Sequence, residues 1–215
     1  MILFHKYPPR TKWFEWLFAV FAVLMTSGAY VDAWAHRHLD SALETFFTPW
    51  HALLYGGAGL LGGLHIITAY INYKKGYDWK RVLPPEFMIS LVGFLLFMSG
   101  GVFDLVWHVV FGIEAGIEAL YSPSHLILFI AGTMGLGGLW RGLWHRDDAP
   151  KNFLDAVPTL LSLTCVLSIL SFAAQDFHPL VNPFMAQSVA AKHGELGISL
   201  GLASIVIQTA ILMAI

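Results

Sequence analysis

Residues 48–73 read TPWHALLYGGAGLLGGLHIITAYINY and contain no aspartate, glutamate, lysine or arginine. A helix needs roughly 20 mostly apolar residues to cross the hydrocarbon core of a bilayer, so this stretch is long enough. It begins with Thr48-Pro49, a helix-start signal in which the hydroxyl residue caps the helix and proline fills its first position. It ends before Lys74-Lys75. The stretch therefore predicts a transmembrane helix.

Similar apolar runs flank this stretch on both sides. We expect six membrane-spanning helices, at about 13–35, 49–73, 86–111, 123–143, 153–175 and 188–213. The first run is too long for the apolar part of a cleaved signal peptide and is interpreted as a retained helix. The last run reaches the C-terminus without a polar tail, as it would in a chain that continues further. The predicted fold is all-α, a polytopic membrane helical bundle forming one domain over 1–215.

The composition agrees with a chain surrounded by lipid. Apolar residues make up 57% and charged residues only 12%, with a mean hydropathy of +0.65. Soluble proteins carry about 25% charged residues. A net charge of −2 argues against a basic nucleic-acid-binding surface. Because Cys165 is the single cysteine, disulfide frameworks and zinc ribbons are excluded.

Lysine and arginine are distributed unevenly over the segments between the runs. If the N-terminus is cytoplasmic, the outer segments hold only Arg37 and Lys192. The inner segments then hold Lys6, Arg10, Lys12, Lys74, Lys75, Lys80, Arg81, Arg141, Arg146 and Lys151. Because cytoplasmic loops of membrane proteins are enriched in these residues, we expect both termini in the cytoplasm and the protein in the cell (inner or plasma) membrane.

Two of the outer hairpin turns carry the same pattern of acidic residues and histidines. The first copy reads Asp32-Ala-Trp-Ala-His36, followed by Glu44-Thr-Phe-Phe-Thr48-Pro49-Trp-His51. The second copy reads Asp104-Leu-Val-Trp-His108, followed by Glu118-Ala-Leu-Tyr-Ser122-Pro123-Ser-His125. We interpret this as an internal repeat of helical hairpins, with repeat 1 at about 13–75 and repeat 2 at about 85–145. A degenerate third repeat is expected at about 153–215, with Asp176, His178 and His193 at its turn.

The spacing of each copy predicts one cluster between two helices. Asp and His four residues apart lie on the same helical face, near the outer end of the first helix. The Ser/Thr-Pro pair places the second histidine in the first turn of the returning helix. Antiparallel packing of the two helices then brings the three side chains together.

Two imidazoles and a carboxylate without a thiolate suit copper, zinc or iron, of which copper binds most strongly. A lone membrane histidine is more often packed or hydrogen-bonded, and an Asp–His pair can relay protons. The recurrence of the whole pattern favours metal ligands. We predict two copper sites, with zinc or iron as alternatives, at Asp32, His36, His51 and at Asp104, His108, His125. Glu44 and Glu118 are predicted to be further ligands or hydrogen-bond acceptors for the ligand rings.

These motifs resemble the C subunit of membrane-bound copper monooxygenases, the methane and ammonia monooxygenase family, or a divergent relative. The resemblance covers roughly residues 28–60 and 98–132. It implies that Asp32, His36 and His51 match an Asp/His/His copper site of that subunit. It implies that Asp104, His108 and His125 match the neighbouring site, where the family often has Asn in place of Asp104. It also implies a role for Glu44 and Glu118, and a larger, trimeric complex with other membrane subunits.

Three functions are compatible with these features. The resemblance implies an oxidoreductase, a monooxygenase subunit that oxidises a small substrate with O2. A non-enzymatic copper-binding, transport or accessory protein is the alternative, although Cu(I) carriers favour clustered methionine and cysteine. A b-type cytochrome would use His51 and His65, which are fourteen residues apart on one helix. For His65, a packed or hydrogen-bonded histidine in a glycine-rich helix is the simpler interpretation.

Overall fold

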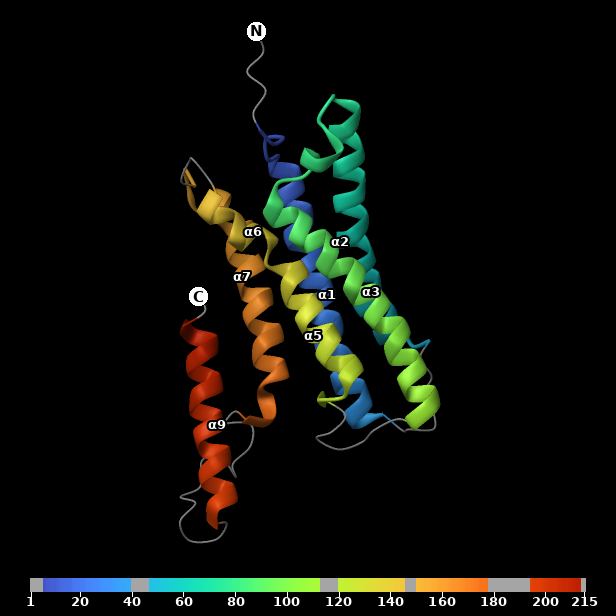
Figure 1. Cartoon of the computed structure of the whole chain (residues 1–215), viewed down its shortest axis with the longest axis vertical. Coiled ribbons are helices and arrows are strands. Elements are labelled where there is room, and N and C mark those ends of the chain that lie inside the picture. Colours follow the sequence, from blue (N-terminus) through green and yellow to red (C-terminus); the bar gives the residue numbers. More distant parts are fainter. Residues whose placement is uncertain (1–5, 40–46, 113–119, 146–149, 178–193, 214–215) are drawn as a thin grey trace.

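The computed structural model describes residues 6–39, 47–112, 120–145, 150–177 and 194–213, and within these ranges the secondary structure is helical without a strand (Figure 1). The longer elements are α1 (Lys12–His38), α2 (Pro49–Lys74), α3 (Pro85–Phe111), α5 (Pro123–Leu136), α7 (Phe153–Ala173) and α9 (Gly194–Met213). The shorter ones are η2 (Trp79–Arg81), α6 (Gly138–Arg141), η3 (Gly142–His145) and η4 (Gln175–Phe177). The predicted all-α fold class is thereby confirmed.

Within the described ranges, four helices are long and apolar enough to cross a membrane: α1, α2, α3 and α7. A fifth span results if α5 is combined with the segment Gly138–Trp144, which is bent from it by 47°. The predicted number of six is not confirmed, because within α9 the apolar stretch Gly201–Met213 is too short to count as a span. Residues 188–193 of the predicted sixth span lie outside the described ranges. The sixth span and the hairpin repeats stay predictions.

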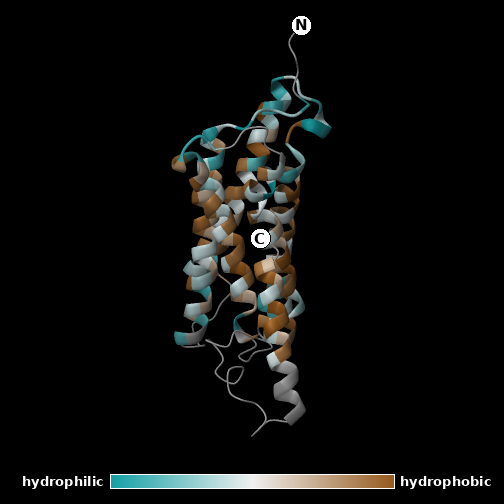
Figure 2. Ribbon diagram, turned by 90° about the vertical axis from the view of Figure 1, so that its left-hand side faces the viewer, coloured by the Kyte–Doolittle hydropathy of each residue, from teal (hydrophilic) through white to brown (hydrophobic). Residues whose placement is uncertain are grey.

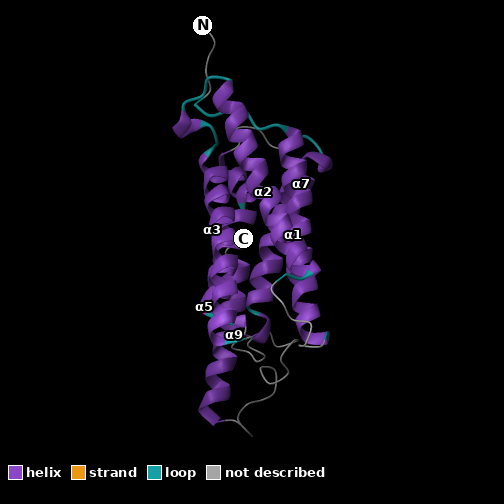
Figure 3. Cartoon of the chain, turned by 90° about the vertical axis from the view of Figure 1, so that its right-hand side faces the viewer, coloured by secondary structure: helices purple, strands orange, loops and turns teal. Residues whose placement is uncertain are grey.

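The helices form a bundle in which α1 packs along α2 and α3 packs along α5 (Figures 1 and 3). Glycine permits the close approach within the first pair. A Cβ atom added to Gly28 would lie 2.6 Å from Leu54 Cα, and one added to Gly57 would lie 2.6 Å from Met25 Cα. Such small residues are typical of helix interfaces in membranes, where packing rather than the hydrophobic effect holds helices together.

The bend between α5 and α6 frees backbone carbonyls, and buried side chains bind them. Arg141 donates a hydrogen bond of 2.7 Å to Met134 O and another of 2.9 Å to Ser90 Oγ. Ser162 on α7 donates a hydrogen bond of 2.6 Å to Leu136 O. In an apolar medium each unbound carbonyl would cost several kcal/mol, so these contacts make the bend stable. The span predicted at about 123–143 therefore contains a bend, if α5 and the segment Gly138–Trp144 form one span.

Most of the described basic residues lie at one end of the bundle, beside the N-terminus, where Figure 2 shows the hydrophilic residues gathered above a hydrophobic band. Arg10 connects three segments at this end. It donates a hydrogen bond of 2.5 Å to Glu86 Oε1 on α3 and one of 2.6 Å to Gly142 O. Glu86 is only 3% exposed, so this is a buried ion pair. The Asp–His clusters lie at the opposite end, where α1 ends and α2 begins.

His65 is part of the hydrophobic core. Its side chain is fully buried, and its Nδ1 lies 2.7 Å from Leu61 O. Four phenylalanine rings contact the imidazole, with centroids 5.4 to 6.1 Å from it: Phe14, Phe18, Phe87 and Phe94. His65 is thus the packed, hydrogen-bonded histidine that the glycine-rich helix predicted.

Candidate metal centre

The start of α2 places His51, as the Thr-Pro signal predicted. Thr48 is the N-cap of α2, with extended backbone, and its Oγ1 accepts a hydrogen bond of 3.2 Å from His51 N. Pro49 opens the helix, so that His51 is its third residue. The capping hydroxyl of Thr48 therefore binds the backbone N–H of His51, the candidate ligand itself. At the start of α5, Ser122 Oγ accepts a hydrogen bond of 3.3 Å from His125 N in the same way.

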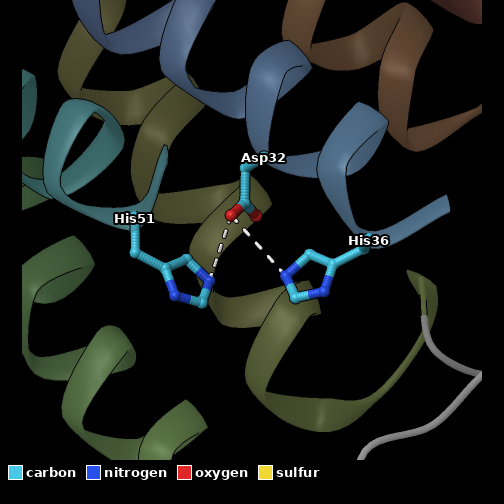
Figure 4. Close-up of side chains that lie close together, drawn as sticks. All are labelled: Asp32, His36 and His51. Atoms are coloured by element: carbon cyan, nitrogen blue, oxygen red, sulfur yellow. Dashed lines mark ion pairs between the residues drawn. The ribbon is translucent and has the colours of Figure 1, made fainter. Parts of the chain in front are cut away.

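Asp32, His36 and His51 converge on one point between α1 and α2 (Figure 4). Asp32 Oδ1 lies 3.1 Å from His51 Nε2 and 3.6 Å from His36 Nε2. The Oδ1 atom is buried, and no hydrogen bond to it is found among the described residues. A buried carboxylate oxygen that faces two imidazole nitrogens needs a positive partner, either a metal ion or a protonated ring.

Asp104, His108 and His125 form the second cluster, between α3 and α5. Asp104 Oδ1 lies 3.5 Å from both His108 Nε2 and His125 Nε2. The two imidazole centroids are 5.9 Å apart, compared with 5.5 Å for His36 and His51. Each of the six predicted ligands is therefore in a cluster with its predicted partners.

The distances in both clusters are compatible with a bound metal ion. Ligand bonds of about 2.1 Å at tetrahedral angles place neighbouring ligand atoms about 3.4 Å apart, and right angles place them about 3.0 Å apart. The four distances from carboxylate to imidazole are 3.1, 3.5, 3.5 and 3.6 Å. In each cluster all three candidate ligand atoms lie within 4.8 Å of one another.

A residue that the sequence analysis missed supports the second cluster. Ser124, which is fully buried, donates a hydrogen bond of 2.7 Å to Asp104 Oδ1. Ser124 Oγ also lies 3.1 Å from Ser122 Oγ, so Ser124 connects the N-cap hydroxyl of α5 to the Asp104 carboxylate. The sequence could have indicated this role, because Ser124 lies within the second motif, between Pro123 and His125. Trp50 occupies the equivalent place in the first copy and has no hydroxyl.

Tyr55 lies between the two clusters. It follows His51 by one helical turn, and the two ring centroids are 6.0 Å apart. A Cβ atom added to Gly101 on α3 would lie 2.8 Å from Tyr55 Cζ, so the ring packs against the turn that precedes Asp104. Tyr55 interacts electrostatically with both Asp32 and Asp104, and these two carboxylates also interact with each other. The clusters are therefore neighbours, and charge at one affects the other.

The clusters are only partly shielded from the surroundings. In the first, the His36 side chain is 33% exposed and that of His51 is 12% exposed. In the second, Asp104 is buried and both histidines are partly exposed. Three protein ligands and an open side would leave coordination positions for water or another molecule.

Other predicted participants are not placed at the clusters. Glu44 and Glu118 lie outside the described residues, as do His178 and His193 of the expected third repeat. The structure does not describe the side chain of Asp176. Trp34 is 55% exposed and stacks on His38, with centroids 5.0 Å apart, and Phe47 is 86% exposed. Such exposure is typical of aromatic residues at a membrane interface.

No protein-family model, curated protein or solved structure matches this chain. The resemblance to the copper monooxygenase C subunit therefore rests on the two motifs alone.

Proposed function

We propose that the chain is an integral membrane, metal-binding subunit, with one copper ion held by Asp32, His36 and His51 and a second by Asp104, His108 and His125. The observation that supports this proposal is the occurrence of two matched clusters in one chain. In each cluster a carboxylate oxygen faces two imidazole Nε2 atoms at distances typical of neighbouring metal ligands. Packing alone gives no reason for the same three residue types to converge twice.

Within this proposal the residues of the chain have defined roles. The helix caps Thr48 and Ser122 fix the second histidine of each site, and Ser124 orients the Asp104 carboxylate. The open side of each cluster admits a small molecule from the water or from the bilayer. Copper, when bound, supplies one-electron and O2 chemistry that amino-acid side chains do not provide. By resemblance, the function is that of a monooxygenase subunit that oxidises a small substrate.

We also propose, from the distribution of basic residues, that both termini are cytoplasmic and that the sites lie toward the outer face of the cell membrane. By resemblance, the subunit works in a larger, trimeric complex with other membrane subunits. Blue-native electrophoresis of the protein extracted from its own membrane tests the assembly. Migration at the mass of this chain alone contradicts it.

Metal analysis of the purified full chain tests the binding sites. We expect two copper ions per chain in the wild type and none in the double variant His51→Ala, His125→Ala. The matched control is His38→Ala, because His38 lies at the end of α1 outside both clusters, with its Nδ1 2.8 Å from Trp34 O. Copper content that is unchanged in the double variant contradicts the proposal, since the clusters would then be ion pairs.

A non-enzymatic copper-binding or transport function is the second candidate, and the 33% exposure of His36 favours it, because an exposed ligand permits exchange of the ion. Oxygen consumption by the assembled, copper-loaded complex separates the two functions. Consumption that depends on a small hydrocarbon or ammonia, and is lost in the double variant, identifies an oxygenase. Transfer of copper to a chelator without oxygen consumption identifies a carrier.

A further inference from the structure

A cavity lies at the end of the bundle opposite the Asp–His clusters. Its volume is about 200 Å³, and it is enclosed by the segment before α1, the last turns of α2 and the start of α3. Residues from all three segments line it, among them Arg10, Trp13, Ile71, Lys75 and Phe87. The two metal clusters do not involve any of these residues.

The rim of the cavity has an apolar side and a cationic side. Trp13 and Ile71 form the apolar side of the rim. They are 46% and 37% exposed, respectively, so both side chains can contact lipid. Lys75, one turn beyond Ile71, is the C-cap of α2 and is exposed. The inner wall is mostly apolar, since Phe14, Leu83 and Phe87 are buried there. The buried Asn72 also lines it and donates a hydrogen bond to Val82 O. A ligand in this cavity would meet both a cation and apolar surface.

The charges around the cavity leave Lys75 as the cation that is available to a ligand. Arg10 is already bound to Glu86 and Gly142 O, and it lies over the Phe87 ring. Lys12 forms an ion pair of 2.6 Å with Asp155. Lys74 lies over the Tyr70 ring instead of lining the cavity. For Lys75, no ion pair is found within the part of the chain that the structure describes.

We propose that this cavity binds the headgroup of an anionic phospholipid from the leaflet on the N-terminal side of the protein. The phosphate contacts Lys75, and an acyl chain passes beside Trp13 and Ile71. Anionic headgroups bind to basic pockets between membrane helices on the cytoplasmic side, and this end carries the basic residues. Free phosphate would match the cation but would leave the apolar walls without a partner. The proposal is independent of the metal sites.

Native mass spectrometry of the full chain in detergent tests the proposal, with phosphatidylglycerol and phosphatidylcholine of the same acyl chains as probes. We expect phosphatidylglycerol to bind at least fivefold more tightly. A surface lysine contributes about 1 kcal/mol to binding of anionic lipid, so Lys75→Ala is expected to weaken it about fivefold. Lys74→Ala, which removes the same charge one residue away but outside the cavity lining, is the matched control and is expected to weaken binding less than Lys75→Ala does. An equal loss in both variants, or equal binding of the two lipids, overturns the proposal.

A second pair of variants tests the cavity itself. Thr68→Phe places a ring in the cavity, whereas Ile67→Phe places it on a neighbouring exposed position that does not line it. We expect only Thr68→Phe to abolish the preference for phosphatidylglycerol, with the helical circular dichroism unchanged in both. Inorganic phosphate is the third probe. If inorganic phosphate binds the cavity as tightly as phosphatidylglycerol does, the apolar walls contribute nothing to binding, and the proposal fails.

Discussion

Ser124 donates a hydrogen bond of 2.7 Å to Asp104 Oδ1, the oxygen that faces both histidines of the second cluster. The first cluster has no equivalent, because Trp50 occupies the corresponding position and Asp32 Oδ1 accepts no hydrogen bond from the described residues. The carboxylate of the second site is thus fixed in orientation before any ligand binds. The two clusters therefore differ in the hydrogen bonding of their carboxylates, although their candidate ligands are of the same residue types.

Removal of this support is expected to weaken one site only. Hydrogen bonds to metal ligands typically contribute 10- to 100-fold to metal affinity, so Ser124→Ala is expected to lower copper affinity at the second site by about that factor. Isothermal titration in a His51→Ala background, which leaves the second site alone, measures this change. In a His125→Ala background, which leaves the first site alone, we expect no change.

The control for Ser124→Ala is Ser99→Ala. Ser99 is also on a helix near the second cluster, but its hydroxyl is exposed and donates to Leu95 O in its own helix. If both variants bind copper at the second site as tightly as the wild type does, the hydrogen bond from Ser124 to Asp104 does not contribute to copper affinity.

The helix caps give a second prediction. Loss of an N-cap hydroxyl costs about 1 kcal/mol, so Thr48→Ala is expected to lower the free energy of unfolding by about this amount. It is also expected to weaken copper binding at the first site, since Thr48 Oγ1 binds the backbone N–H of His51. Thr48→Ser keeps the hydroxyl and is the control. Denaturant titration in mixed detergent measures the stability; equal stability of the two variants contradicts a capping role.

The buried pair of Arg10 and Glu86 gives a third prediction. Removing one partner of a buried ion pair leaves the other uncompensated and costs about 3 kcal/mol or more. Glu86→Ala is therefore expected to be strongly destabilising in a thermal unfolding experiment. The exposed pair of Lys12 and Asp155 is the control, because exposed pairs contribute little, and Lys12→Ala is expected to leave the unfolding temperature unchanged. If Glu86→Ala and Lys12→Ala lower the unfolding temperature by similar amounts, Glu86 is in contact with water and its ion pair contributes no more than an exposed pair does.

Local signals in the sequence predicted where α2 and α5 begin and which residues gather in each cluster. The Thr48-Pro49 and Ser122-Pro123 pairs begin α2 and α5 as expected, and the spacing of four places Asp and His on one face. These features depend on neighbouring residues alone, so the sequence contains them directly. The bend at Gly137 is different. It depends on Arg141 and on Ser162, which is on another helix, and no local pattern predicts that contact.

The role of Tyr55 between the clusters and the pairing of Arg10 with Glu86 were not predicted for the same reason. Each joins residues that are far apart in the chain. The glycine-rich stretches are an intermediate case. Small residues favour close contacts between membrane helices. The sequence does not distinguish Gly57, which contacts the backbone of α1, from Gly59, beside which there is open space. Only the angle at which two helices cross decides which glycines are in contact.

This distinction gives a fourth prediction. A Cβ atom at Gly93 on α3 would lie 2.9 Å from both Ala131 O and Gly135 Cα on α5, so the two helices would have to separate. Overpacking of this kind costs about 1–3 kcal/mol. Because Asp104 is on α3 and His125 is on α5, we expect Gly93→Ala to weaken copper binding at the second site more than at the first. Titrations in the His51→Ala and His125→Ala backgrounds compare the two sites.

Gly59→Ala is the matched control, since no atom lies within 4 Å of its added Cβ. Alanine is a better helix former than glycine by about 1 kcal/mol, so this variant is expected to be as stable as the wild type or slightly more stable. Its copper affinity is expected to be unchanged at both sites. If Gly93→Ala lowers the affinity of both sites equally, the effect is a general loss of stability, and the contact between α3 and α5 does not set the geometry of the second site.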